Sequence, residues 1–291
     1  MRASHLLLFG MLLGAAAPPS SRLAGIDVHR DIPYASDVRE LRLDVYRPKG
    51  LDLRPVLLFL HGGGWIRGSK DDAFPELYPA PQEGARRWPS MLPFLSHGLA
   101  IVTLDYRLAA EARAPAAVDD CRRGLDWIVA NGAAYGLDAA RVVTIGPSAG
   151  GHLALMVAFA PRSPVIGAVD LYGITDVGPL LAAPTQRFWA VEWIGPEPGQ
   201  ATRAREASPL TLVRSGLPPV LIAHSIADAE VPYEQSLRLV DALRGAGVSV
   251  DLLRFEDTPH GFFDDAELAR LEGAILAFLA RLGVTATHSP R

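Results

Sequence analysis

A serine lies between two glycines in the segment 142–159, which reads VVTIGPSAGGHLALMVAF. Gly146, Ser148 and Gly150 form a Gly-x-Ser-x-Gly motif where strand-like residues give way to helix-like ones. A tight turn at such a place raises the serine oxygen above a sheet, where it can act as a nucleophile. The amide of Ala149 opens the expected helix and points to the same spot, since a helix N-terminus favours negative charge. The pattern predicts Ser148 as a nucleophile, against the alternative of a glycine-bounded turn with a solvent-facing serine.

Three adjacent glycines follow an apolar run in the segment 56–68, VLLFLHGGGWIRG. Such a loop leaves backbone amides uncovered, and acyl transfer needs donors aimed at the oxyanion of its tetrahedral intermediate. The amides of Gly62 and Gly63, together with that of Ala149, are predicted to form this oxyanion hole. A phosphate-binding turn is disfavoured because neither a Lys-Ser/Thr pair nor a Gly-x-Gly-x-x-Gly pattern follows.

A serine hydroxyl needs a base, and in this type of fold the acid and then the histidine follow the serine along the chain. His260 lies in the Pro/Gly-bracketed segment 257–265, DTPHGFFDD, between the last expected strand and the last expected helix. It is predicted to be the base, with His152, four residues after the serine, as the alternative. His224 ends an apolar strand, where a core role is expected, and His288 lies in the C-terminal tail.

The acid that orients the histidine is expected in the loop after the preceding strand, HSIADAEVP at 224–232. Asp228 is predicted to be this residue, with Glu230 and Asp257 as alternatives. These residues predict a two-step acyl transfer through an acyl-enzyme, in which the acid fixes the tautomer of the imidazole. Histidine side chains ordinarily titrate near pH ~6.5, so activity is expected to rise through mildly acidic pH and to be lost when His260 is protonated.

The elements that must position these residues alternate between short apolar runs and longer amphipathic ones, which predicts a single α/β fold with a mostly parallel sheet of about eight strands and helices on both faces. Strands are predicted at 26–34, 41–47, 55–60, 99–105, 142–146, 165–171, 219–225 and 250–255. The first two are expected to form an antiparallel edge. Helices are predicted at 115–131, 149–160, 233–245 and 265–282.

Two segments interrupt this alternation, 68–90 and 172–214, and are expected to be loops or a small cap beside the pocket. The second contains Phe188, Trp189 and Trp193, which together with Trp65 are candidate residues of the substrate pocket. Local packing within the cap is the alternative role for these aromatic side chains.

Composition narrows the class of protein further. The 291 residues fit one catalytic domain over 25–284, and 49% hydrophobic residues supply a sizeable core. A net charge of −4 without a Lys/Arg run disfavours a nucleic-acid partner. The lone cysteine, Cys121, excludes an internal disulfide and is expected to be buried.

The N-terminus has the layout of a secretory signal, with Arg2 before an apolar run at 6–17 and then small residues and two prolines. Residues 1–24 are therefore predicted to be a signal peptide, and the protein to be secreted or periplasmic, with a cytoplasmic location as the alternative. The run is shorter than the roughly 20 residues that a membrane-spanning helix needs, so no stable membrane span is expected. The tail, 285–291, is expected to be frayed.

Taken together, the motifs resemble those of the α/β-hydrolase esterases related to hormone-sensitive lipase, in particular the shorter bacterial carboxylesterases known as feruloyl-esterase-like or acetyl-esterase-like. The resemblance runs from about 26 to 282 and rests on the opening 30–50 and on 61–65 (HGGGW), 105–108 (DYRL), 146–152 (GPSAGGH), 208–210 (SPL), 228–232 (DAEVP) and 260–262 (HGF). It implies the triad and oxyanion roles assigned above, with no metal or organic cofactor. Two residues depart from the family pattern: Pro147 replaces a usual acidic residue, and Ser225 replaces a common glycine.

The resemblance implies a serine carboxylic-ester hydrolase. The short N-terminal region leaves little room for a long N-terminal cap, and the open, modest pocket that is therefore expected favours a small-molecule ester with a short acyl chain or a small aromatic group. The alternatives are a small-amide hydrolase resembling arylformamidases and a non-catalytic binding module with the same fold. The sequence does not indicate the natural ester or the oligomeric state.

Overall fold

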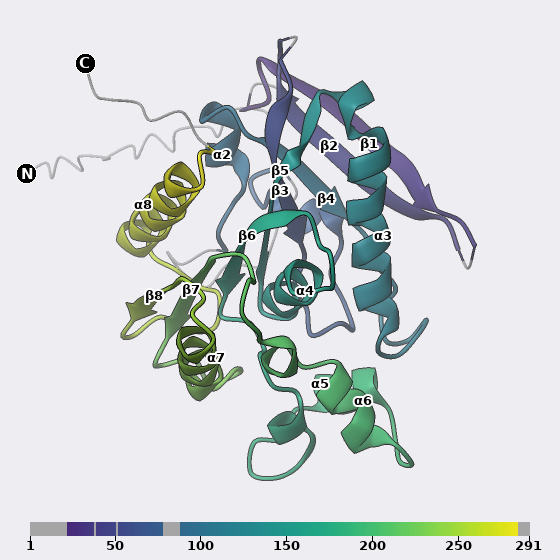
Figure 1. Cartoon of the computed structure of the whole chain (residues 1–291), viewed down its shortest axis with the longest axis vertical. Helices are drawn as coiled ribbons and strands as arrows, with labels where there is room; N and C mark the ends of the chain where they lie inside the picture. Colours follow the sequence, from purple (N-terminus) through teal and green to yellow (C-terminus); the bar gives the residue numbers. More distant parts are fainter. Residues whose placement is uncertain (1–21, 38, 51, 78–87, 285–291) are drawn as a thin grey trace, which may run out of the picture.

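The computed structural model describes residues 22–284 except 38, 51 and 78–87. An eight-stranded sheet in the order β1-β2-β4-β3-β5-β6-β7-β8 forms its centre (Figure 1). The strands are β1 (Ile26–Ala35), β2 (Leu41–Pro48), β3 (Arg54–Leu60), β4 (Ala100–Leu104), β5 (Leu137–Pro147), β6 (Val165–Leu171), β7 (Val220–Ser225) and β8 (Val250–Phe255). β1 pairs antiparallel with β2, and β2 with β4, whereas the strands from β4 to β8 run parallel. The predicted fold class and all eight predicted strands are confirmed.

The helices are α2 (Leu92–Ser96), α3 (Ala116–Asn131), α4 (Ala149–Ala158), α5 (Phe188–Ile194), α6 (Gln200–Glu206), α7 (Glu234–Gly245) and α8 (Asp265–Arg281), with 3-10 turns η1 (Lys70–Ala73), η2 (Gly132–Tyr135), η3 (Gly178–Leu181) and η4 (Pro209–Leu212). The four predicted helices correspond to α3, α4, α7 and α8. The interrupting segment 172–214 contains α5 and α6, which extend away from the sheet in Figure 1.

The central strands are apolar along their length because both of their faces are covered. In β3 the pleat directs Val56 and Leu58 into one hydrophobic cluster, while Leu57 and Phe59 enter the other. α3, α4 and α7 cover the first cluster, and α2 and α8 cover the second. The helices thereby fix the sheet, and the ends of its strands form a rigid base for loops.

The chain ends lie outside the described residues: most of the predicted signal peptide (residues 1–21) and the predicted frayed tail (285–291). None of the helices in the described ranges has the length and apolarity that crossing a lipid bilayer requires. Cys121 is buried on α3 with a free thiol, as expected.

Candidate active site

Ser148 occupies a strained turn between β5 and α4, with φ of 54° and ψ of −121°. The flanking glycines are required by backbone crowding. A Cβ atom on Gly146 would lie 2.4 Å from the carbonyl oxygen of Leu60, and one on Gly150 would lie 2.0 Å from the same oxygen. The end of β3 therefore presses against the turn from the side, so only glycine fits on either side of the serine.

The structure brings together the three residues predicted as a triad. His260 Nε2 lies 2.9 Å from Ser148 Oγ, and His260 Nδ1 lies 2.6 Å from Asp228 Oδ2. Ser148 follows β5, Asp228 follows β7 and His260 follows β8, so each lies in a loop at the carboxyl end of its strand. Ser148 is 8% exposed. The predicted nucleophile, base and orienting carboxylate thus form one hydrogen-bonded chain.

The carboxylate of Asp228 is buried, and both of its oxygens accept hydrogen bonds. Its Oδ1 accepts hydrogen bonds from the amides of Glu230 and Val231, both at 2.9 Å. Burial opposes ionisation, but hydrogen bonds from His224 and His260 outweigh it and hold the pKa of this carboxyl below its usual range. Asp228 is therefore a carboxylate at neutral pH, suited to stabilise an imidazolium at His260.

His224 is a neighbour of the site that the sequence did not identify. It is the penultimate residue of β7 and has a buried side chain, as expected of a core histidine, but its Nε2 lies 3.2 Å from Asp228 Oδ2. The same nitrogen lies 3.1 Å from the carbonyl oxygen of Val231, and Nδ1 lies 2.7 Å from Ser236 Oγ. The only sequence signal was its place at a strand end four residues before the acid.

The alternative residues take other positions. His152 is buried, and its Nε2 lies 2.6 Å from the carbonyl oxygen of Ala207. Burial lowers its pKa to about 4, so it is a neutral donor to that carbonyl. Glu230 contributes its backbone amide to Asp228, and the side chain of Asp257 is exposed. His288 lies outside the described residues.

The glycine loop after β3 lies against the nucleophile turn. A Cβ atom on Gly62 would lie 2.9 Å from the carbonyl oxygen of Pro147, and Gly63 has a positive φ of 97°. Within the described ranges, no hydrogen bond uses the amides of Gly62 or Gly63. The loop therefore has free donors beside Ser148, as the prediction of an oxyanion hole requires.

The side chains of His61 and Tyr106 hold the glycine loop in place through hydrogen bonds to its carbonyl groups. Their rings stack at 3.9 Å with an angle of 9° between the planes. The Tyr106 hydroxyl donates to the carbonyl of His61 at 2.9 Å, and the His61 Nδ1–H donates to the carbonyl of Gly62 at 2.9 Å. Burial lowers the pKa of His61 to about 4, so its ring is neutral.

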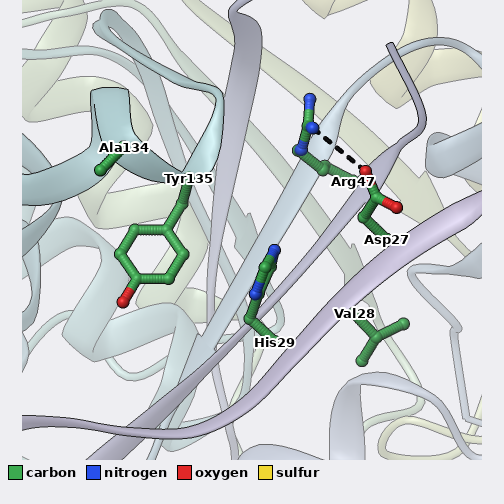
Figure 2. A pocket seen from close by; sticks show the side chains of 6 residues that line it. All are labelled: Asp27, Val28, His29, Arg47, Ala134 and Tyr135. Carbon is green, nitrogen blue, oxygen red and sulfur yellow. Dashed lines mark hydrogen bonds and ion pairs between the residues drawn. The ribbon is translucent and has the colours of Figure 1, made fainter. Parts of the chain in front are cut away.

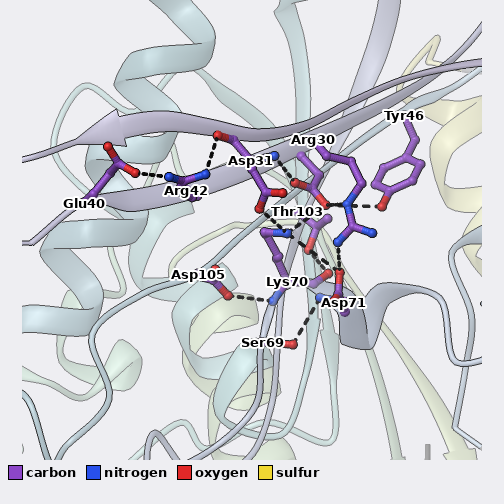
Figure 3. Close-up of polar contacts among 11 residues, drawn as sticks. Arg30, Asp31, Glu40, Arg42, Tyr46, Ser69, Lys70, Asp71, Thr103 and Asp105 are labelled. Atoms are coloured by element: carbon purple, nitrogen blue, oxygen red, sulfur yellow. Dashed lines mark hydrogen bonds and ion pairs between the residues drawn. The ribbon is translucent and has the colours of Figure 1, made fainter. Parts of the chain in front are cut away.

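The far end of the loop is anchored by a cluster of charges (Figure 3). Lys70 Nζ lies 3.0 Å from Asp44 Oδ2 and 3.1 Å from Asp31 Oδ1, and Arg30 reaches the same Asp44 oxygen at 3.1 Å. The Lys70 amide also donates to Asp105 Oδ1 at 2.9 Å. This cluster ties η1, which follows the glycine loop, to β1, β2 and the end of β4.

The four candidate pocket aromatics differ in their surroundings. Trp65 and Trp193 have no exposed surface and stack at 4.0 Å with an angle of 10°. Local packing, the alternative role for these side chains, therefore fits Trp65 and Trp193. Trp189 lies against Gly64: a Cβ atom added to this glycine would be 2.9 Å from the Cβ of Trp189. Phe188, in contrast, is 73% exposed.

Further aromatic side chains, which the sequence did not predict as pocket residues, lie near His260. The Tyr172 ring meets the imidazole edge to face at 4.9 Å, and its backbone has a positive φ of 45°. Trp88 packs on Phe262 at 4.9 Å and crowds Gly261, where a Cβ would be 2.6 Å from the indole. Trp88 and Tyr172 are far from His260 in sequence, whereas Phe262 belongs to the motif HGF at 260–262.

Ser225, one of the two departures from the family pattern, joins two loops of the site. Its Oγ accepts hydrogen bonds from the amide of Ala227 at 3.2 Å and from the amide of Thr258 at 3.1 Å. One amide belongs to the loop of Asp228 and the other to the loop of His260.

A surface hollow of about 360 Å³ lies elsewhere (Figure 2). It is lined by Asp27, Val28, His29, Arg47, Ala134 and Tyr135. Tyr135 lies two residues before β5, whereas Ser148 follows that strand, so the hollow lies at the opposite end of the sheet from the triad. The described part of the chain contains no group of three or more His, Cys, Asp or Glu side chains that could hold a metal ion.

The sheet order, the helices on both faces and the Ser-His-Asp arrangement at the carboxyl ends of the strands define a protein of the α/β-hydrolase fold. Comparison with known proteins gives the family. The family model BD-FAE matches residues 43–243, more than half of the chain, and the chain belongs to this family.

Individual proteins that are similar to this chain are also ester hydrolases. The probable carboxylic ester hydrolase LipM of Mycobacterium tuberculosis is 27% identical over 94% of this chain and 67% of its own length. Ethyl acetate hydrolase of Pseudomonas putida is 29% identical over 78% of this chain and 72% of its own. The thermophilic esterase Est2 of the Planctomycetes species Thermogutta terrifontis superimposes with a TM-score of 0.72 at 26% identity, covering 92% of this chain and 96% of Est2. Further structures show Est2 bound to butyrate and to propionate.

The chain spans about two thirds of the length of the curated mycobacterial esterases that it matches. These similarities place it among the carboxylesterases, a class of serine hydrolases.

Proposed function

We propose that Ser148, His260 and Asp228 carry out a two-step hydrolysis of carboxylic esters. His260 Nε2 takes the proton of Ser148 as Oγ attacks the ester carbonyl, and the same proton then passes to the departing alcohol. Water, activated by the same nitrogen, releases the acid from the acyl-enzyme. The observation that carries the proposal is the continuous chain of hydrogen bonds from Ser148 Oγ through His260 to Asp228 Oδ2.

The developing oxyanion would be held by the amides of Gly62, Gly63 and Ala149. Two observations support this assignment: the glycine loop lies against Pro147, next to the nucleophile, and Ala149 begins α4 directly after it. A preorganised donor of this kind lowers the barrier by about 2.7 to 4 kcal/mol.

The substrate class that fits best is an ester with a short acyl chain or a small aromatic group. The cap contains two seven-residue α-helices, α5 and α6, and the aromatic ring of Tyr172 contacts the His260 imidazole at 4.9 Å. Ethyl acetate hydrolase and the butyrate-bound Est2 are relatives whose names point to short acyl groups.

Hydrolysis of p-nitrophenyl acetate, butyrate and decanoate by the purified protein tests the proposal, with Ser148→Ala as the control. We expect turnover of the two short esters, slow turnover of the decanoate, and a loss of at least roughly a thousandfold in the Ser148→Ala variant. Unchanged turnover in that variant would refute the assigned nucleophile. Preference for an aryl formamide over its ester analogue would instead indicate a small-amide hydrolase, and no labelling by a fluorophosphonate probe would indicate a binding module.

We also propose that residues 1–24 are an export signal and that the enzyme acts in the periplasm or outside the cell. The support is the arrangement of Arg2, the apolar run at 6–17 and the following small residues. Mass spectrometry of the N-terminus from separated cell fractions tests this, and an intact leader on protein found only in the cytoplasm would refute it.

A further inference from the structure

We propose that His224 is a positioning residue for the hydrolytic reaction: it fixes the carboxylate of Asp228 so that Oδ2 faces His260. The inference rests on the proposed function, because it assigns a role to a neighbour of the triad. His224 does not contact the reacting atoms, and it acts through Asp228.

The geometry places Asp228 Oδ2 between two imidazoles. His260 Nδ1 approaches this oxygen at 2.6 Å and His224 Nε2 at 3.2 Å. The side chains of His224 and Asp228 are both essentially inaccessible to solvent, with relative exposures of 0% and 1%. Water therefore cannot easily replace a hydrogen bond that is lost at this oxygen.

Counting hydrogens defines the state of the His224 ring. The neighbours of Nε2, the Val231 carbonyl and the Asp228 carboxylate, can only accept, so Nε2 must carry a hydrogen. In a neutral ring Nδ1 is then an acceptor, and the Ser236 hydroxyl at 2.7 Å is its donor. Ser236 thereby selects the tautomer of His224 that can donate to Asp228.

The other bonds to Asp228 show why this contact matters. Its Oδ1 is held by the amides of Glu230 and Val231, which are two and three residues further along the same loop and move with it. His224 belongs to β7, and Ser236 belongs to α7. Among the polar contacts that the described residues make with this carboxylate, the one from His224 is the one that ties it to the sheet rather than to a loop.

This role explains a polar pair in a place that packing alone would fill with apolar residues. His224 and Ser236 have almost no exposed surface and lie on facing sides of β7 and α7. Burying two polar side chains costs free energy unless they satisfy each other. Here the hydrogen on His224 Nε2 lies between the Val231 carbonyl at 3.1 Å and the acid of the triad at 3.2 Å.

The experiment compares His224→Leu, His224→Gln and Ser236→Ala with the wild-type enzyme on p-nitrophenyl butyrate. Leucine removes the donor at similar volume, whereas the glutamine amide can put an N–H near the place of Nε2. We expect His224→Leu to lower kcat roughly 10- to 100-fold with little change in KM, as for the loss of a hydrogen bond to a charged group. His224→Gln should recover most of the loss, and Ser236→Ala should lose roughly three- to tenfold. Thermal melting and circular dichroism report whether each variant folds.

A double-mutant cycle separates positioning from general support of the fold. In an Asp228→Asn background, His224→Leu should have less than a threefold further effect on kcat, because the carboxylate through which His224 acts is gone. Losses that multiply in the double variant, equal losses in the leucine and glutamine variants, or an unchanged kcat in His224→Leu would each overturn the inference. If Ser148→Ala retained activity, the proposed function itself would fail, and this outcome is distinguishable from the others.

Discussion

Asp170 at the end of β6 offers a quantitative test of how burial shapes this protein. The side chain has no exposed surface, and its Oδ1 accepts a hydrogen bond from the amide of Gly173 at 2.8 Å. Its Oδ2 forms no hydrogen bond with the described residues. Burial raises the pKa of this carboxyl to about 7 from the ordinary 3.8, although the bond from Gly173 opposes the change.

The sign and size of the effect on stability follow from this pKa. Because folding raises it, the contribution of Asp170 to stability is fully present below about pH 4 and is lost as the pH rises through about 7. Each pKa unit between the unfolded and the folded chain corresponds to about 1.4 kcal/mol, so the ionised carboxylate costs roughly 4 kcal/mol above pH ~8. Asp170→Asn removes the titration while preserving the shape and the acceptor for Gly173.

Urea unfolding of the wild type and of Asp170→Asn between pH 4 and pH 9 measures the cost. We expect equal free energies of unfolding near pH 4 and an advantage of the variant that grows to a few kcal/mol at alkaline pH. Asp241→Asn, on the exposed side of α7, is the control and should change stability by less than about 0.5 kcal/mol at any pH. A difference between wild type and Asp170→Asn that is the same at every pH would refute the reasoning, because a carboxyl that is already ionised at pH 5 would give that result.

Two further substitutions test the scaffold of the site. Ser225→Ala removes the acceptor of two backbone amides, one of them the buried amide of Thr258, and should therefore lower the free energy of unfolding by about 1 to 3 kcal/mol and also lower kcat. Thermal melts and ester hydrolysis measure the two effects, and full stability and activity in this variant would contradict the linking role. Lys70→Met leaves the buried Asp44 with one cation fewer and should lower the free energy of unfolding, measured by denaturant, by roughly 3 kcal/mol. The control Lys49→Met, at an exposed residue, should lower it by less than about 0.5 kcal/mol, and equal losses in the two variants would show that the charge cluster does not anchor the loop.

The strands and the main helices could be predicted from sequence because their pattern follows directly from burial. A strand covered on both faces, such as β3, must be apolar throughout, and this run is visible without any structure. The start of β5 was not visible: the strand begins at Leu137, five residues before the predicted 142. Its first two residues, Leu137 and Asp138, pair with Arg54 and Pro55 of β3, and a register shift follows before Val142, a contact that the local sequence does not encode.

The short helices of the cap illustrate the same limit. α5 and α6 have seven residues each, too few to be stable alone, so tertiary contacts decide whether they form. The stack of Trp65 on Trp193 joins residues 128 positions apart, and only the folded chain distinguishes packing from a pocket wall. The nucleophile motif and the glycine loop were predictable because each is a short contiguous run whose glycines stand beside the residues of the reaction.

Contacts between loops and rigid elements account for the part of the site that the sequence did not reveal. Ser148, Asp228 and His260 all lie in loops, yet each loop is fixed from outside itself. The turn of Ser148 is pressed against β3 at Leu60, and Ser225 at the end of β7 accepts amides from the loops of both Asp228 and His260. A glycine at this position could not make these bonds, because it has no hydroxyl. The departure at Ser225, which in sequence puts the loop geometry in question, therefore adds a link between the acid and the base, and substitution by alanine should loosen both loops together.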